Sequence, residues 1–114
     1  MSEFASTIVQ EMLASGARTT SGTTSGFNFE DGIELIVFAE VTAASGTSPT
    51  LDLAIQTSHD NTNWAALSSF TQITGTGNSI KAVTNYGKYI RVSYTIAGTT
   101  PSFTFKLTAV RKSN

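Results

Sequence analysis

Three segments of the sequence alternate apolar and polar residues with a period of two, and this pattern constrains the fold more than any other feature. They span residues 50–58 (TLDLAIQTS), 89–97 (YIRVSYTIA) and 102–110 (SFTFKLTAV). Alternation of this kind places one side of an extended strand against a core and the other side in solvent. We therefore predict three half-buried antiparallel strands.

The segment 32–44 (GIELIVFAEVTAA) differs, because apolar residues occupy both of its faces. One face would carry Ile33, Leu35 and Val37, and the other Ile36 and Phe38. This arrangement predicts a central strand that is covered on both sides. Shorter strands are expected at 64–70 and 78–83, and the spacing of turn signals along the chain is typical of a sandwich or barrel.

The domain organisation follows from the length of 114 residues, which suits one domain. We predict an all-β fold: a single-domain antiparallel β-sandwich, jelly-roll-like, at 17–114 with an N-terminal arm at 1–16. Residues 17–32 are rich in Ser, Thr and Gly, and we expect this segment to be mobile or ordered by a partner. The apolar residues of the arm have the spacing of one face of a helix, but they also fit an extended segment, which we favour. They are Phe4, Ile8, Val9, Met12 and Leu13.

Two near copies of one short sequence, GTSPTLDL at 46–53 and GTTPSFTF at 98–105, contain both prolines of the chain. Glycine leaves φ free and proline fixes it just before a strand begins. We therefore expect two similar hairpins, at 33–57 and 89–110, with the copies as structural corners at one end of the sandwich. Their tips are also candidate partner contacts: Gly46, Thr47, Ser48, Pro49, Gly98, Thr99, Thr100 and Pro101.

The composition excludes several classes of function. Charged residues make up 13% of the chain, about half the usual share, and the net charge is −1. The basic residues are scattered, so we expect no nucleic-acid partner. The absence of cysteine excludes a disulfide scaffold and a thiolate site. No apolar run has the length of a membrane span, and the start lacks the basic region of a secretory signal, so we expect synthesis in the cytoplasm.

The stretch TSHDNTNW at 57–64 holds the best candidates for catalysis, His59 and Asp60. Neighbouring residues on a strand or turn point in different directions, whereas a catalytic triad needs His between Ser and Asp. Ser58, Asp60 and Trp64 resemble instead the Asp-box of sialidase-type propellers, in which these residues build a hairpin turn. We therefore predict a hairpin turn and no enzyme activity.

Two kinds of binding site, for a metal ion and for a sugar, are also tested against the sequence. Glu30 with Asp31, and Asp60 with Asn61 and Asn63, are the acidic clusters, and neither has the spacing of a known calcium loop. We therefore predict no metal site and no cofactor. Small β-sandwiches often bind sugars through exposed aromatic residues, and Trp64 and Tyr86 are the candidates. A carbohydrate-binding module is thus the alternative function.

Residues from Leu51 to Val110 resemble small structural proteins of tailed bacteriophages and prophages. The segments that carry the resemblance are LDLAIQTSHDNTNW, LSSFTQIT and YGKYIRVSYTIAGTTPSFTFKLTAV, about half of the chain. Residues 1–31 take no part in it, and it includes no catalytic motif and no binding residue that could be carried over.

The resemblance implies a virion protein, most plausibly a capsid decoration or cement protein. Such proteins are commonly small β-rich domains that trimerise on the capsid shell and grip it with a terminal arm. We therefore expect a homo-oligomer, with a trimer favoured, on the capsid surface, and the major capsid protein as partner. A tail or head–tail adaptor protein is the alternative within the virion class.

Overall fold

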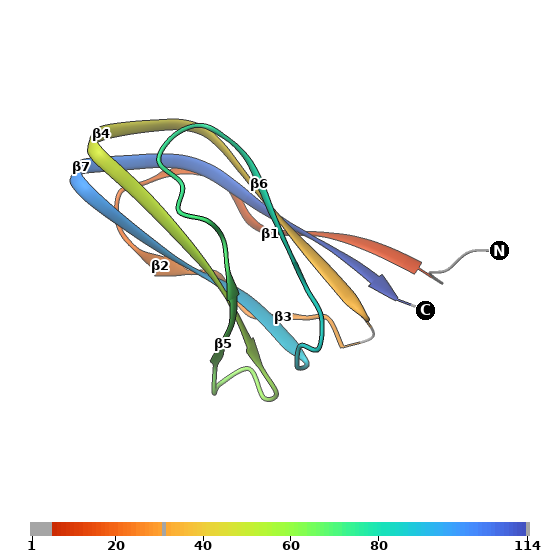
Figure 1. Ribbon diagram of the computed structural model, residues 1–114. Helices are drawn as coiled ribbons and strands as arrows, with labels where there is room; N and C mark the ends of the chain where they lie inside the picture. The colour runs from red at the N-terminus through yellow and green to blue at the C-terminus, as the bar shows by residue number, and fades with distance from the viewer. Residues whose placement is uncertain (1–5, 31, 114) are drawn as a thin grey trace.

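The computed structural model describes residues 6–30 and 32–113, and these residues contain strands and no helix. All strand pairings are antiparallel. The predicted all-β fold is confirmed, since the chain forms one compact antiparallel sandwich (Figure 1). The strands are β1 (Ser6–Arg18), β2 (Gly22–Thr23), β3 (Phe27–Asn28), β4 (Glu34–Ser58), β5 (Ala65–Ser69), β6 (Gly77–Val83) and β7 (Tyr89–Ser113).

Two long strands, β4 and β7, pair with each other along their whole length, from Glu34 opposite Lys112 to Ser58 opposite Tyr89. Both bend back at the same place, so that each passes from one layer of the sandwich to the other (Figure 1). The first layer contains β1, the second half of β7, the first half of β4, and β6. The second layer contains the first half of β7, the second half of β4, and β5, with β2 and β3 on β7.

The bend lies at the two near copies, and Thr47 of one copy pairs with Thr99 of the other. The prediction of corners is confirmed, but the prediction of two hairpins is wrong. The halves of each long strand lie in different layers, and each half pairs with the other long strand. The physical reason is that both copies bend in the same way, so the pairing of β4 with β7 resumes beyond the corner.

Glycine is required in both copies because each approaches the backbone of the other. Gly46 has a φ of 110° and Gly98 a φ of 125°, values that side chains disfavour. A Cβ atom on Gly46 would lie 2.8 Å from the carbonyl oxygen of Thr100. A Cβ atom on Gly98 would lie 3.0 Å from the carbonyl oxygen of Ser48. The repeated sequence therefore builds one corner from two mutually packed copies.

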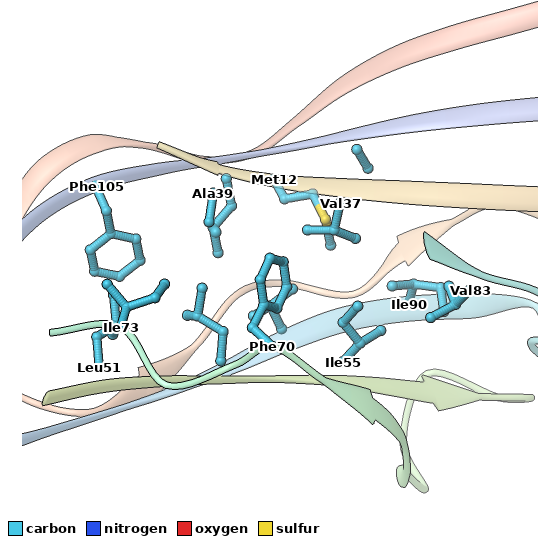
Figure 2. Packing of buried hydrophobic residues seen from close by; sticks show 14 of the residues in the cluster. Met12, Val37, Ala39, Leu51, Ile55, Phe70, Ile73, Val83, Ile90 and Phe105 are labelled. Carbon is cyan, nitrogen blue, oxygen red and sulfur yellow. The ribbon is translucent and has the colours of Figure 1, made fainter. Parts of the chain in front are cut away.

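The core lies between the two layers and is filled by the inward-facing residues of both (Figure 2). The alternating segments behave as predicted, since every second residue of β7 from Phe103 to Ala109 is buried. The largest fully buried side chains are Phe103, Phe105, Leu35, Leu51, Leu53, Ile55, Ile90 and Leu107. Burial of each such side chain contributes about 1.5–3 kcal/mol to folding.

The first half of β4 is buried on one face only. Leu35 and Val37 are fully buried, whereas Ile36 and Phe38 on the outer face are half-exposed. Ile33 precedes the strand and is 46% exposed, so it does not continue the buried face. The prediction of a strand covered on both sides is therefore wrong for the described residues, because a two-layer sandwich covers only the inner face of each layer.

The N-terminal segment is a strand of the sheet. Residues Ser6–Arg18 form β1, which pairs with the second half of β7, so the extended alternative is correct and the helix is not. The register shifts between Glu11 and Leu13, and Met12 turns into the core with 4% of its surface exposed. The predicted boundary between residues 16 and 17 falls within this strand.

The Ser/Thr/Gly-rich segment after β1 lies along β7 through the short strands β2 and β3. The Thr24 amide donates to the Val92 carbonyl oxygen over 2.9 Å, and the Val92 amide donates to Thr24 Oγ1 over 3.0 Å. Thr24 and Phe29 are buried. The expectation of a mobile or partner-ordered segment is wrong for its described residues, because the chain's own sheet orders them.

Candidate functional site

The stretch between β4 and β5 is a tightly hydrogen-bonded turn. The Ser58 hydroxyl accepts the amides of Asp60 and Asn61 over 3.1 and 2.9 Å and donates to the Asp60 carboxylate over 2.9 Å. Asp60 Oδ1 accepts the amides of Thr62 and Asn63 over 3.0 and 2.8 Å. Because Thr57 then pairs with Ala65 across the two strands, the predicted hairpin turn is confirmed.

The electrostatics of the turn fit a structural role. Hydrogen bonds from the amide of Asn63, and next from that of Thr62, hold the pKa of Asp60 well below its usual range. His59 is 83% exposed, with its Nε2 atom 3.8 Å from Asp60 Oδ2. The Ser58 hydroxyl bonds to Asp60 and not to His59, so no Ser–His–Asp relay is assembled here.

The acidic residues do not gather into a metal site within residues 6–30 and 32–113. Asp60 uses its carboxylate within the turn. Glu30 accepts a hydrogen bond from the Asn28 side chain and lies 3.5 Å from Lys88 Nζ, and these contacts lower the pKa of Glu30. Its predicted companion Asp31 lies outside the described residues.

The two aromatic candidates for sugar binding are half-buried. Arg91 lies over the Trp64 ring at 4.4 Å from its centroid and donates a hydrogen bond from Nε to Gln56 Oε1 over 2.7 Å. One face of the Trp64 ring is therefore occupied. Tyr86 packs against the core, and burial raises the pKa of its hydroxyl.

The predicted contact residues of the arm have different environments. Ile8 and Val9 are exposed, Leu13 is half-buried against the core, and Met12 is buried. Phe4 lies outside the described residues. Met12 is therefore not available on the surface, while contact of Ile8 and Val9 with a partner stays a prediction.

The predicted tips lie at the far end of the first layer from the start of β1 (Figure 1). Six of their residues are exposed and the two prolines are half-buried. The tips comprise Gly46, Thr47, Ser48, Pro49, Gly98, Thr99, Thr100 and Pro101. The structure therefore does not bring the arm and the tips together into one site, and contact of the tips with a partner stays a prediction.

An apolar surface that the sequence did not predict covers the outer face of the first layer. Val9 of β1 pairs with Val110 of β7, which pairs with Ile36 of β4, which pairs with Ala82 of β6. Phe38 of β4 pairs with Ile80 of β6 in the next row. We call this surface the outer patch, and it consists of Val9, Ile36, Phe38, Ile80, Ala82 and Val110.

The sequence carried one signal of the outer patch, namely the second apolar face at Ile36 and Phe38. Its other members come from three different strands and are separated by many residues in the chain. Their position side by side depends on which strands pair with which, and the alternation within one strand does not identify its partner strand.

The comparisons place the fold among small two-layer β-sandwiches. No protein-family model and no curated protein matches the chain. The PBSX exported protein XepA has a TM-score of 0.68 at 14% identity, over 94% of this chain and 37% of XepA. A structure of infectious bursal disease virus, Gx strain, has a TM-score of 0.60 at 13% identity, over 95% of this chain and 32% of the viral chain.

A third similar structure is a module of an enzyme. The CBM36-1 domain of a multidomain xylanase from the hindgut metagenome of Trinervitermes trinervoides has a TM-score of 0.54 at 7% identity. That match covers 96% of this chain and 99% of the domain. At these identities the likenesses establish the fold alone. In the part of the chain that the structure describes, no helix has the length and hydrophobicity needed to cross a membrane.

Proposed function

We propose that the chain is a non-enzymatic structural protein of a bacteriophage virion. The observation that carries the proposal is its fold likeness to XepA, a protein of phage PBSX, at a TM-score of 0.68. The resemblance of residues 51–110 to phage structural proteins points the same way, and the viral structure with the same fold agrees with it. The polar cluster at Ser58–Asn63 supports the non-enzymatic role, because its hydrogen bonds close a turn.

Within that class, the proposal is a capsid decoration or cement protein that binds the major capsid protein and oligomerises on the shell. The resemblance favours a trimer. The exposed apolar side chain of Ile8, together with the exposed, uncharged tips, would supply contacts of the kind that bind a shell surface without electrostatic steering. A tail or head–tail adaptor protein is the alternative within the virion class.

Co-sedimentation tests this function. Purified chain is mixed with capsid shells from the phage that encodes it, after deletion of its gene, and the shells are pelleted. We expect saturable binding at a fixed ratio to the major capsid protein, weakened by Ile8→Asp in the arm or by Thr99→Arg at a tip. Thr71→Arg, at an exposed loop position, is the matched control. Chain that stays in the supernatant at every concentration would contradict the proposal.

A carbohydrate-binding module is the second candidate, and the observation that favours it is the fold likeness to the CBM36-1 domain. A glycan screen with the wild-type chain separates the two functions. Saturable glycan binding that is lost in Trp64→Ala, while the variant keeps its circular dichroism spectrum, would favour the second candidate. Absence of glycan binding together with shell binding would reject it.

A further inference from the structure

The outer patch is a continuous apolar surface on a protein with few charges. On its edge strands Val9 is 68% and Ile80 61% exposed, and its central residues Ile36 and Phe38 are half-exposed. Single exposed apolar residues are common, but a contiguous patch marks an interaction surface. No described element lies over this face of the first layer (Figure 1).

Charged residues border the patch at both ends, and they are arranged by strand. At one end Glu34 of β4 lies opposite Lys112 of β7, with Lys112 Nζ 3.9 Å from Glu34 Oε1. At the other end Glu40 of β4 lies opposite Lys106 of β7. In these two cross-strand pairs the acidic residue is on β4 and the basic residue is on β7. A third acidic residue of the same face, Glu11 of β1, lies 3.5 Å from Lys106 Nζ.

This arrangement is complementary to itself. Sheets that pack face to face keep their strands nearly aligned, and a two-fold axis along the strands, between β4 and β7, would set β4 of one copy over β7 of the other. Glu34 would then face the Lys112 side chain of the second copy, and Glu40 would face Lys106. A two-fold axis across the strands would instead set Glu34 against Glu40 and Lys112 against Lys106. Repulsion between these like charges disfavours that arrangement.

We propose that the outer patch is the interface of a two-fold symmetric dimer of this chain, with β4 of each copy packed over β7 of the other. Ile36 of one copy then lies over Val110 of the second, so the same apolar residues are covered on both copies. The charged ends set the register, and the apolar rows between them supply the affinity. The net charge of −1 opposes such pairing only weakly.

This inference rests on the proposed function for the expectation of self-association, and it puts a two-fold symmetric dimer in place of the trimer that the resemblance favours. The test of the dimer needs no shell, so the dimer and the proposed shell binding can fail separately. Sedimentation velocity is run with the full chain from about 1 to about 200 µM, a range that covers dissociation constants in the micromolar region. We expect a monomer–dimer equilibrium for the wild type. A monomer throughout, or a trimer, would overturn the inference and leave shell binding untouched.

A substitution within the patch tests the surface itself. Ile80→Asp places a charge at an exposed position of β6, which faces Glu11 of the second copy in the proposed arrangement. We expect at least a tenfold weaker dimer with unchanged circular dichroism. Thr71→Asp, at an exposed position in the loop before β6, is the control and should dimerise like the wild type. Equal dimerisation of Ile80→Asp and the control would overturn the inference.

A pair of charge reversals tests the symmetry axis. Glu34→Lys and Lys112→Glu should each weaken self-association, because each homodimer would hold two like-charged contacts. A mixture of the two variants should form a heterodimer of nearly wild-type affinity, because both contacts are then between opposite charges. The axis across the strands predicts no such rescue, so a mixture that stays as weak as its components would overturn the proposed geometry.

Discussion

Substitution of Gly98 by alanine tests the account of the corner. The added Cβ atom would lie 3.0 Å from the Ser48 carbonyl oxygen, 3.0 Å from the Pro49 Cα atom and 3.1 Å from the Thr47 carbonyl oxygen, and the residue has a φ of 125°. The conformation costs about 1–2 kcal/mol for a residue with a side chain. The contacts add about 1–3 kcal/mol, because they are made with backbone and not with a side chain that can move away.

Gly98→Ala should therefore lower the free energy of unfolding by about 2–5 kcal/mol. This is a large part of the roughly 5–15 kcal/mol by which a domain is stable. Denaturant unfolding, followed by tryptophan fluorescence and circular dichroism, measures it. Two glycines serve as matched controls. Gly77→Ala has the unfavourable φ of 139° with no atom within 4 Å of the added Cβ, and Gly75→Ala lacks both penalties.

The order of destabilisation should therefore be Gly98→Ala, then Gly77→Ala, then Gly75→Ala. The difference in unfolding free energy between the first two variants measures the contact between the two near-copy segments. The difference between the last two variants measures the cost of the backbone conformation. If Gly98→Ala unfolds at the same denaturant concentration as Gly77→Ala, the packing of the two near-copy segments on each other contributes nothing to stability. The account of the corner is then wrong.

Three further predictions concern the core, the segment that lies along β7, and the turn between β4 and β5. Phe103→Ala, at a fully buried position, should destabilise the fold by about 3–5 kcal/mol in denaturant unfolding. Thr24→Val should cost about 1–3 kcal/mol and speed amide exchange at Val92, whose amide loses its acceptor. Asp60→Ala should lower the melting temperature at neutral pH. The pKa of Asp60 is depressed in the folded state, so its carboxylate stabilises the fold fully above about pH 4, the usual pKa of an aspartate. This stabilisation is lost as the pH falls through the folded pKa. The melting temperatures of the wild type and Asp60→Ala should therefore converge in acid.

The strands could be predicted because their signals are local. The alternation around Leu51–Ile55 and Phe103–Leu107 describes which side of a strand is buried, and that property needs no knowledge of the partner strand. The turn at Ser58 and Asp60 was predictable for the same reason, since its hydrogen bonds join residues two or three positions apart.

The pairing of the strands could not be predicted in the same way. Thr47 pairs with Thr99 across the corner, and Ile36 pairs with Val110 across the sheet. A local turn signal does not distinguish a hairpin from a bend in a long strand, so the two copies predicted hairpins. Met12 is buried through a register shift in β1 that its helix-like apolar spacing does not reveal. The outer patch was missed because it depends on all of these pairings together.

The composition of purified phage particles tests the central claim, that this chain is a structural protein of a virion, most directly. Particles of the phage that encodes the chain are purified by density gradient and analysed by quantitative mass spectrometry against the major capsid protein. The account predicts that the chain is present in a fixed, reproducible ratio to the major capsid protein. Complete particles that lack the chain, in a lysate in which it is expressed, would contradict the account.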